Sequence, residues 1–199
     1  MAGPAFAQVP DEPAPGDARK IGSWRLACAT DQMTDKPVCR LIHQQWIEPP
    51  GPGHAGLVLE VIQRHGQFIP AVTSRELTLM GAARGLLALS GTAQLRFPPK
   101  PMAEAPCALE GRSVICAPTA TDTPRLAEEL RASPRLLVRV QGLANETGEV
   151  PMNLPLAETE AAIAAFRAGL PAGEAAPEPP GSGFDLRWLV QRFRDFFFQ

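Results

Sequence analysis

Prolines divide this chain into short segments. Of its 199 residues, 22 are proline, and they stand near the two ends and between short apolar runs. Proline has no backbone N–H to donate, so it interrupts helices and is excluded from the centre of a sheet. The chain is therefore expected to fold into short elements joined by many turns.

Between these breaks, several runs alternate apolar and polar residues with the period of a β-strand. In 21–28, Trp24 and Leu26 share one side and Arg25 faces the other, as in a half-buried strand. The run 57–64 (LVLEVIQR) is the strongest of these patterns. Further strands are predicted at 38–47, 67–72, 77–80, 85–89, 92–97, 108–117, 136–143 and 150–154.

Two short helices are expected to interrupt the strands. Thr123 followed by Pro124 is a typical helix start, because proline suits the first turn, and the helix is expected to continue over 125–132. The alanine-rich run 155–168 predicts a second helix, which Gly169 is expected to end. Many short strands with few helices favour a mainly β fold, expected as a two-sheet β-sandwich.

Four cysteines stand in two local pairs, Cys28 with Cys39 and Cys107 with Cys116. Neither pair has the C-x-x-C spacing of a redox motif or the spacing of a zinc site. Four cysteines allow three connectivities, and the local one is favoured because each bond would close a hairpin-sized loop between two strand-like runs. Structural disulfides would indicate an exported protein, whereas four free thiols would indicate a cytosolic one.

The N-terminal residues are typical of a signal-peptide remnant. Ala5, Phe6 and Ala7 have the small-x-small pattern of a cleavage site, so the mature chain is expected to begin at Gln8. The charged and apolar regions of a signal peptide do not precede this site, so it stays open whether Met1 is the true start, and an arbitrary alanine-rich tail is the alternative. The expected organisation is a remnant and linker at 1–20, a disulfide-linked domain at 21–170, a Pro/Gly linker at 171–183 and a helix at 184–199.

Charge and hydropathy exclude two classes of protein. The formal net charge is −2 with both signs mixed along the chain, whereas a nucleic-acid-binding protein needs a basic face to neutralise phosphates. Apolar runs of about 18 residues are also missing, so no membrane-spanning helix is expected. The chain is expected to localise to the periplasm, with peripheral membrane contact as an option.

Motifs that carry enzyme chemistry were not found. The sequence contains no nucleophile elbow, dinucleotide-binding or phosphate-binding glycine motif, and no H-E-x-x-H motif. The histidines, His43, His54 and His65, are expected to be surface or hydrogen-bonded side chains, and Glu60 is expected to face solvent. We therefore predict a protein without catalytic residues, metal or cofactor.

The C-terminal residues 184–199 have the pattern of an amphipathic helix. Apolar side chains gather on one arc, and arginines stand toward its C-terminal end, as the helix dipole favours. The helix is expected to bind another protein in a groove, with the membrane interface and its own domain as the alternatives. The predicted partner-binding residues are Leu186, Trp188, Leu189, Val190, Phe193, Phe196 and Phe197.

The order of these features resembles the invasion-associated locus B family of exported bacterial proteins. The resemblance covers 21–170 and rests on the run Trp24-Arg25-Leu26-Ala27-Cys28, the three later cysteines, the short helix after Cys116, and the segment 150–156 before an alanine-rich helix. It implies a periplasmic or envelope β-sandwich with two disulfides and no known enzyme chemistry. Two features depart from the family pattern, namely Ile115 where a glycine is usual and the aromatic C-terminal helix.

The function predicted from these patterns is that of a non-enzymatic periplasmic accessory or binding protein. Its partner is expected to be another protein in a membrane-associated assembly, bound through the C-terminal helix, and no nucleic acid. The alternative is a secreted or surface-exposed envelope protein involved in host-cell interaction.

Overall fold

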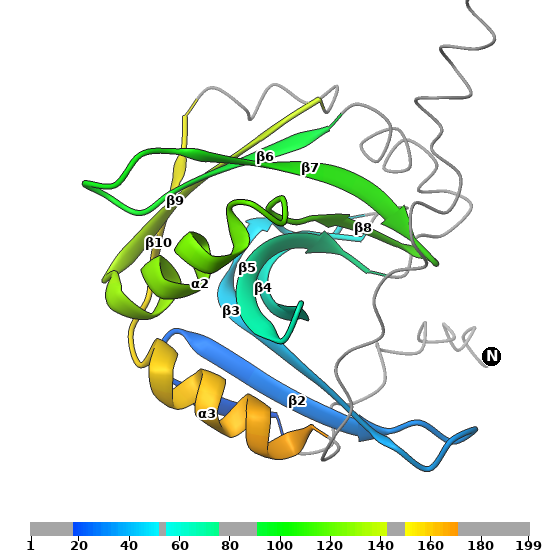
Figure 1. The fold of residues 1–199 in the computed structure, drawn as a ribbon. Helices are drawn as coiled ribbons and strands as arrows, with labels where there is room; N and C mark the ends of the chain where they lie inside the picture. Colours follow the sequence, from blue (N-terminus) through cyan, green and yellow to red (C-terminus); the bar gives the residue numbers. More distant parts are fainter. Residues whose placement is uncertain (1–17, 52–54, 76–90, 143–149, 171–199) are drawn as a thin grey trace, which may run out of the picture.

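A computed structural model describes residues 18–51, 55–75, 91–142 and 150–170 (Figure 1). Short strands dominate this part of the chain, and two helices follow late in the sequence. The strands are β1 (Arg19–Ile21), β2 (Trp24–Thr30), β3 (Pro37–Glu48), β4 (Leu57–Arg64), β5 (Gln67–Ser74), β6 (Thr92–Arg96), β7 (Ala103–Glu110), β8 (Ser113–Cys116), β9 (Arg135–Gln141) and β10 (Met152–Pro155), and the helices are α2 (Thr123–Ala132) and α3 (Thr159–Gly169). The prediction of a mainly β protein with two short helices is confirmed.

The strands pair in one antiparallel sheet. Their order is β1-β2-β3-β4-β5-β8-β7-β6-β9-β10. The two separate sheets of the predicted sandwich are not found, because β7 pairs with β8 on one side and with β6 on the other. This shared strand makes the hydrogen-bonded ladder continuous, so the two expected layers are two halves of one sheet.

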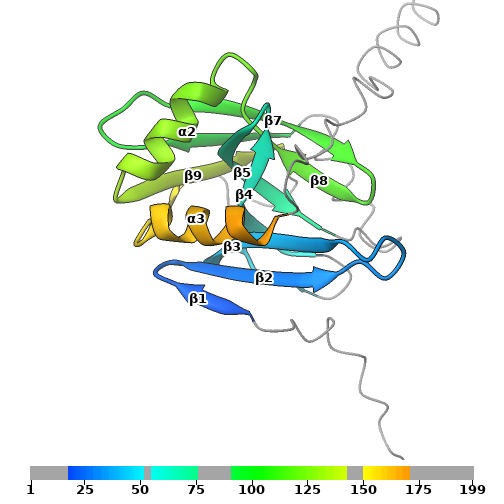
Figure 2. The same ribbon diagram turned by 60° about the horizontal axis from the view of Figure 1, so that its bottom comes forward.

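The sheet is bent so that its two halves enclose a common core, as Figures 1 and 2 show. Trp24 and Leu59 from the first half belong to the same buried cluster as Leu95, Leu136 and Leu154 from the second. Burial of apolar surface between the halves is the main force that holds such a bent sheet together. Helix α3 adds its own buried residues to this core and packs on β2 and β3.

The two ends of the sheet meet at a tight turn. The predicted strand 21–28 is split, because Gly22 adopts a φ of 55° and turns the chain from β1 into β2. A Cβ on Gly22 would lie 2.2 Å from the carbonyl oxygen of Ala157, so only glycine fits there. Ser23 N donates to that oxygen at 3.1 Å, and Ala157 N donates to Ser23 Oγ at 3.0 Å. These bonds connect the β1–β2 turn to the segment that follows β10.

Helix α2 begins within one residue of its predicted start, whereas α3 begins later than predicted. In α2, Thr123 was expected as the residue before the first turn but is already helical, and Asp122 occupies the N-cap position without a side-chain hydrogen bond to the helix. Helix α3 starts at Thr159, not at 155, because Pro155 is the last residue of β10 and pairs with Arg135. The start of the alanine-rich run, Pro155, therefore pairs with β9 and is not part of the helix.

Helix α2 packs on β5 and contributes to both apolar clusters. Leu126 and Leu130 are fully buried in the main core, as their four-residue spacing predicts. Ala127 instead packs in a second apolar cluster with Ile69 and Ala71 of β5. The helix thus covers the outer face of β5 while two of its leucines fill the interior.

Several predicted segments can be compared with the structure only in part. The late strand pair is confirmed as β9 and β10, which pair antiparallel. The run 92–97 is β6, and the second cysteine pair spans β7 and β8, with β7 beginning earlier than predicted, at Ala103. The predicted strands at 77–80 and 85–89, most of the N-terminal remnant at 1–20, the linker at 171–183 and the helix at 184–199 lie outside the described residues.

Candidate functional site

The four cysteines form two disulfides, each within its own hairpin. Cys28 is bonded to Cys39 and Cys107 to Cys116, with S–S distances of 2.08 Å and 1.98 Å. Each pair occupies directly opposite positions on adjacent antiparallel strands, β2 with β3 and β7 with β8. This is the local connectivity that the sequence favoured, and its physical basis is the short hairpin that brings each pair together.

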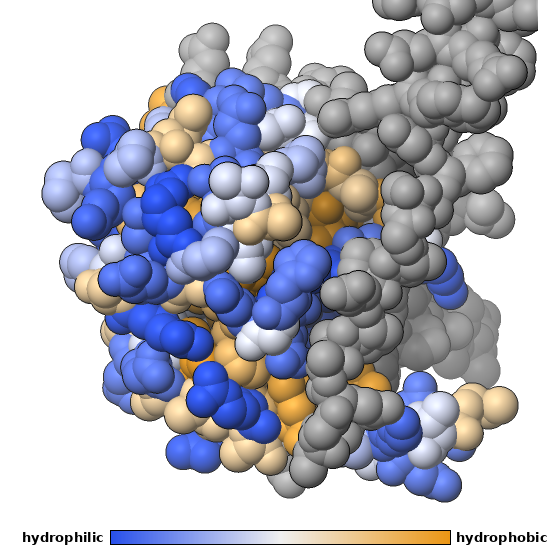
Figure 3. All heavy atoms as spheres, viewed as in Figure 1, coloured by the Kyte–Doolittle hydropathy of each residue, from blue (hydrophilic) through white to orange (hydrophobic). Residues whose placement is uncertain are grey.

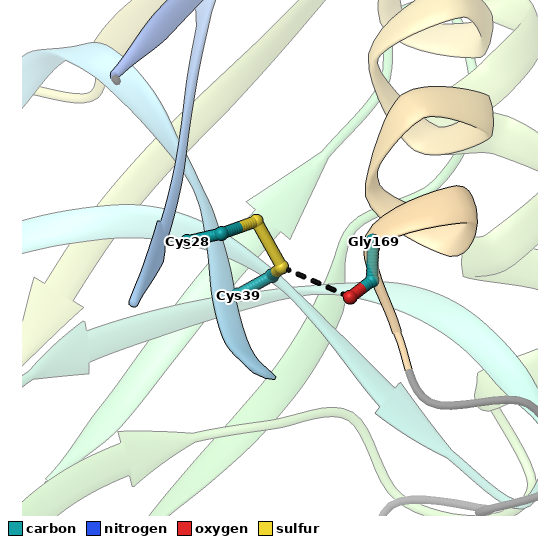
Figure 4. The surroundings of a disulfide bond; sticks show 3 residues. All are labelled: Cys28, Cys39 and Gly169. Carbon is teal, nitrogen blue, oxygen red and sulfur yellow. Dashed lines mark hydrogen bonds between the residues drawn. A yellow bond between two sulfur atoms is a disulfide. The ribbon is translucent and has the colours of Figure 1, made fainter. Parts of the chain in front are cut away.

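The first disulfide lies against the end of α3 (Figure 4). The carbonyl oxygen of Gly169 is 3.2 Å from Cys39 Sγ. Since a disulfide sulfur carries no proton, this is a close packing contact and not a hydrogen bond. A Cβ on Gly169 would lie 2.8 Å from Cys39 Sγ and 3.2 Å from Cys28 Sγ.

Helix α3 ends at Gly169, as the sequence predicted. Gly169 is the last helical residue, its φ is not positive, and Leu170 is the C-cap, so a left-handed conformation is not what requires glycine here. Glycine is needed because the sulfur atoms leave no room for a side chain. The helix end and the disulfide therefore form one packed unit.

Glu60 is buried on the outer face of the sheet, where the sequence predicted exposure to solvent. Only 3% of the residue is exposed. Its carboxylate accepts a hydrogen bond from Thr73 Oγ1 at 2.6 Å and two from Arg75, from Nε at 3.0 Å and Nη2 at 2.9 Å. Arg40 Nε lies 3.5 Å from the same carboxylate, at a geometry that gives an ion pair without a hydrogen bond.

The charge state of Glu60 follows from these partners. Burial alone raises the pKa of a carboxyl group, but the charge and hydrogen bonds of Arg75, together with Arg40 and Thr73, outweigh it. The pKa of Glu60 is therefore held below its ordinary value. The cluster keeps one excess positive charge, and its geometry is that of a structural ion-pair network joining β3, β4 and β5.

His43 is the buried histidine of the described domain, with 2% of its surface exposed. Its Nδ1 accepts a hydrogen bond from Gln45 N at 3.0 Å, and its Nε2 lies 2.8 Å from Pro155 O, to which it can only donate. The contact with Pro155 O requires a proton on Nε2, and the contact with Gln45 N uses Nδ1 as an acceptor. Nδ1 is used within β3, and Nε2 connects β3 to the end of β10.

A small hollow of about 180 Å³ opens beside His43, at the edge of the sheet. Lys20, Arg25, His43, Gln44 and Trp46 line it. Lys20 of β1 and Arg25 of β2 are directly opposite each other in the strand register. Among the described residues, no carboxylate forms an ion pair with either cation.

The sequence pattern did not reveal this pair of cations. The sequence predicted one strand over 21–28, so Lys20 lay before this strand and had no predicted cross-strand partner. The signal was the glycine at position 22, because a turn there folds β1 back on β2 and sets Lys20 opposite Arg25.

A larger groove of about 560 Å³ runs between α2 and the β4–β5 turn. Arg131, Arg167 and Glu128 stand along it, and the buried Oε1 of Gln67 has no hydrogen-bond donor there. Arg131 is paired with Glu160, and Arg167 stacks 5.1 Å from the ring centre of Phe68. Figure 3 shows mostly hydrophilic residues over this face, with apolar residues visible between the two helices.

The side chains predicted to bind a partner cannot be placed. Leu186, Trp188, Leu189, Val190, Phe193, Phe196 and Phe197 lie outside the described residues. Within the described ranges, no helix is long and apolar enough to cross a bilayer. The same ranges contain no group of three His, Cys, Asp or Glu side chains that could hold a metal ion.

Comparison with known proteins found no match to this chain. No family model, curated protein or solved structure matches the sequence.

Proposed function

We propose that this protein is a non-enzymatic accessory or binding protein of the periplasm, which docks on a membrane-associated protein assembly through the segment 184–199. The resemblance to the invasion-associated locus B family belongs to the same proposal, since that family implies an exported β-sandwich with two disulfides. The bent β domain acts as the rigid body of the protein. The amphipathic segment makes the contact with the partner.

The two disulfides are the observation that carries the proposal. Disulfides of this structural kind persist in oxidising compartments and are rare in the cytosol. Both are cross-strand bonds within the β domain, and one of them packs on the last residue of α3. An oxidising, exported environment is therefore the one in which both disulfides of this fold would persist.

The position of α3 supports the use of the C-terminal segment. Gly169 lies against the Cys28–Cys39 disulfide, and Leu170 packs against the main core. The chain that continues from Pro171 thus starts at a fixed point of the domain. The residues 171–183 contain four prolines and three glycines, a composition that extends a linker and suits a tether between two bodies.

Deletion of residues 184–199 tests the docking function directly. The full chain is expected to co-fractionate with membranes, and the deletion is expected to release it into the soluble periplasmic fraction. A variant with Leu189→Asp and Phe193→Asp should be released in the same way, because a charge on the apolar arc opposes burial in a groove. Gln191→Ala with Arg194→Ala is the matched control in the polar arc and should stay bound.

Three outcomes would contradict parts of the proposal. If the deletion variant still co-fractionated with membranes, the segment would have no docking role. If the full chain bound protein-free vesicles as well as it binds membranes, the segment would bind the membrane interface and not a protein partner. Digestion of the protein by protease added to whole cells would favour the secreted or surface-exposed alternative over a periplasmic accessory protein.

A further inference from the structure

We propose that the hollow formed by β1, β2 and β3 is a binding site for an oxyanion of the phosphate class, with Lys20 and Arg25 as its ligands. This proposal does not depend on the function proposed for the segment 184–199.

Two like charges face each other in this hollow. Lys20 and Arg25 are register partners in an antiparallel pair, so their Cβ atoms are roughly 5 Å apart. Like charges at such positions destabilise a sheet unless a counter-charge lies between them. No carboxylate of the described residues supplies that counter-charge. By contrast, the cations of the nearby outer face, Arg40 and Arg75, share Glu60.

The walls of the hollow are held in place by bonds to the fold. The Gln44 side-chain amide donates to Gly22 O at 2.7 Å and to Trp24 O at 3.2 Å, which fixes it across the β1–β2 turn. His43 is held by Gln45 N and Pro155 O. Trp46 packs so closely on Gly56 that a Cβ there would lie 2.8 Å from its ring. A preformed wall lowers the entropy that is lost when a ligand binds.

The donors that remain available define the ligand. His43 and the Gln44 amide nitrogen are already used in hydrogen bonds to the fold, so the charged donors that remain are the Lys20 ammonium and the Arg25 guanidinium. An arginine fork matches two oxygens of a phosphate group, and a lysine adds a point charge. A phosphate that carries up to two negative charges balances both cations, and a hollow of about 180 Å³ accepts a group of this size. The source is either a soluble phosphate compound or the phosphate of an anionic lipid headgroup.

Titration of the isotope-labelled full chain with inorganic phosphate tests the site. At constant ionic strength, saturable changes in NMR chemical shift are expected for the backbone amides of Lys20, Arg25 and Gln44 and for the Trp46 indole. Lys20→Gln with Arg25→Gln should weaken phosphate binding about tenfold or more, since two charge-assisted hydrogen bonds are lost. Lys100→Gln with Arg112→Gln removes the same charge from exposed positions elsewhere and should bind phosphate as the unchanged protein does.

Vesicles distinguish the two sources of phosphate. The full chain and both double variants are sedimented with phosphatidylcholine vesicles with and without phosphatidylglycerol. Weaker binding to the anionic vesicles by the Lys20/Arg25 variant alone would assign the site to a lipid headgroup, whereas equal vesicle binding with lost phosphate shifts would assign it to a soluble phosphate compound. The proposal is overturned by phosphate shifts that do not saturate, or by shifts that persist unchanged in the folded Lys20/Arg25 variant.

Discussion

The indole Nε1–H of Trp24 donates a hydrogen bond to Thr159 Oγ1 at 3.0 Å, across 135 positions of sequence. Trp24 starts β2 and is fully buried, and Thr159 starts α3 and is almost fully buried. The Thr159 hydroxyl in turn donates to Leu156 O at 3.0 Å. The Thr159 side chain thus connects the first half of the sheet to α3.

Replacing Thr159 by valine is expected to destabilise the protein although the two side chains have the same shape. The Trp24 N–H and the Leu156 carbonyl would both lose their partner, and a buried unpaired group costs about 1–3 kcal/mol. Thr159→Ser keeps the hydroxyl and should cost less than about 1 kcal/mol. Urea unfolding followed by circular dichroism measures both, and equal losses for the two variants would contradict a role for the hydroxyl.

Gly169→Ala is expected to destabilise, although alanine usually stabilises a helix relative to glycine. The new Cβ would approach Cys39 Sγ to 2.8 Å, and such overpacking costs about 1–3 kcal/mol. In a Cys28→Ala, Cys39→Ala background the sulfur atoms are gone, so the same substitution should become neutral or stabilising. A double-mutant cycle on the free energy of unfolding checks this, and an unchanged cost in that background would contradict the packing argument.

Glu60 should make stability depend on acid pH. Its pKa is lower in the folded than in the unfolded chain, so its contribution is complete above the unfolded value, about 4.3, and is lost as the pH falls through the folded value. Glu60→Gln should flatten the pH dependence of the unfolding free energy below about pH 5. At neutral pH it should cost up to about 3 kcal/mol, because Arg40 and Arg75 lose their counter-charge but still reach water in part.

Arg40→Gln is the matched control for this cluster. Arg40 makes one ion pair at 3.5 Å and has more than a third of its side chain exposed, so its removal should cost less than about 1 kcal/mol. Thermal unfolding at a series of pH values separates the two variants. A Glu60→Gln protein with the pH profile of the unchanged protein would exclude Glu60 as the titrating group.

Both disulfides should be present in protein purified from the periplasm. Iodoacetamide should label none of the four cysteines before reduction and all of them after reduction and unfolding, as read by mass spectrometry. Each bond closes a short loop, so Cys107→Ala with Cys116→Ala should lower the free energy of unfolding by roughly 3 kcal/mol. Free thiols in exported material would contradict both the bonds and the compartment.

Local features of the fold were predictable because they depend on near neighbours in sequence. Alternation around Trp24 and Leu26 predicted a half-buried strand, and both residues are buried. The pairing of Cys28 with Cys39 followed from the short loop between them, since hairpin partners meet without help from the rest of the chain. Leu126 and Leu130, four residues apart, share the buried face of α2 as expected.

The residues that the prediction misplaced are those whose surroundings come from several distant elements. Glu60 looked like a solvent-facing residue because its neighbours come from elsewhere in the sequence. Arg40 lies on β3 and Arg75 directly follows β5, and only strand pairing brings them to Glu60. The pairing of Lys20 with Arg25 depends on the turn at Gly22, and the close approach of Ala157 leaves room only for glycine at this position.

The sequence by itself determined a mainly β protein with short strands, two helices and cysteines placed for local disulfides. Only the tertiary structure decided that the strands form one bent sheet, that Glu60 is buried, and that Gly169 is small to accommodate a disulfide. The physical reason is the sequence separation of the residues that interact. Periodicity and loop length depend on residues a few positions apart. Charge compensation and close packing depend instead on groups such as Cys39 and Gly169, which are 130 positions apart and meet only in the folded core.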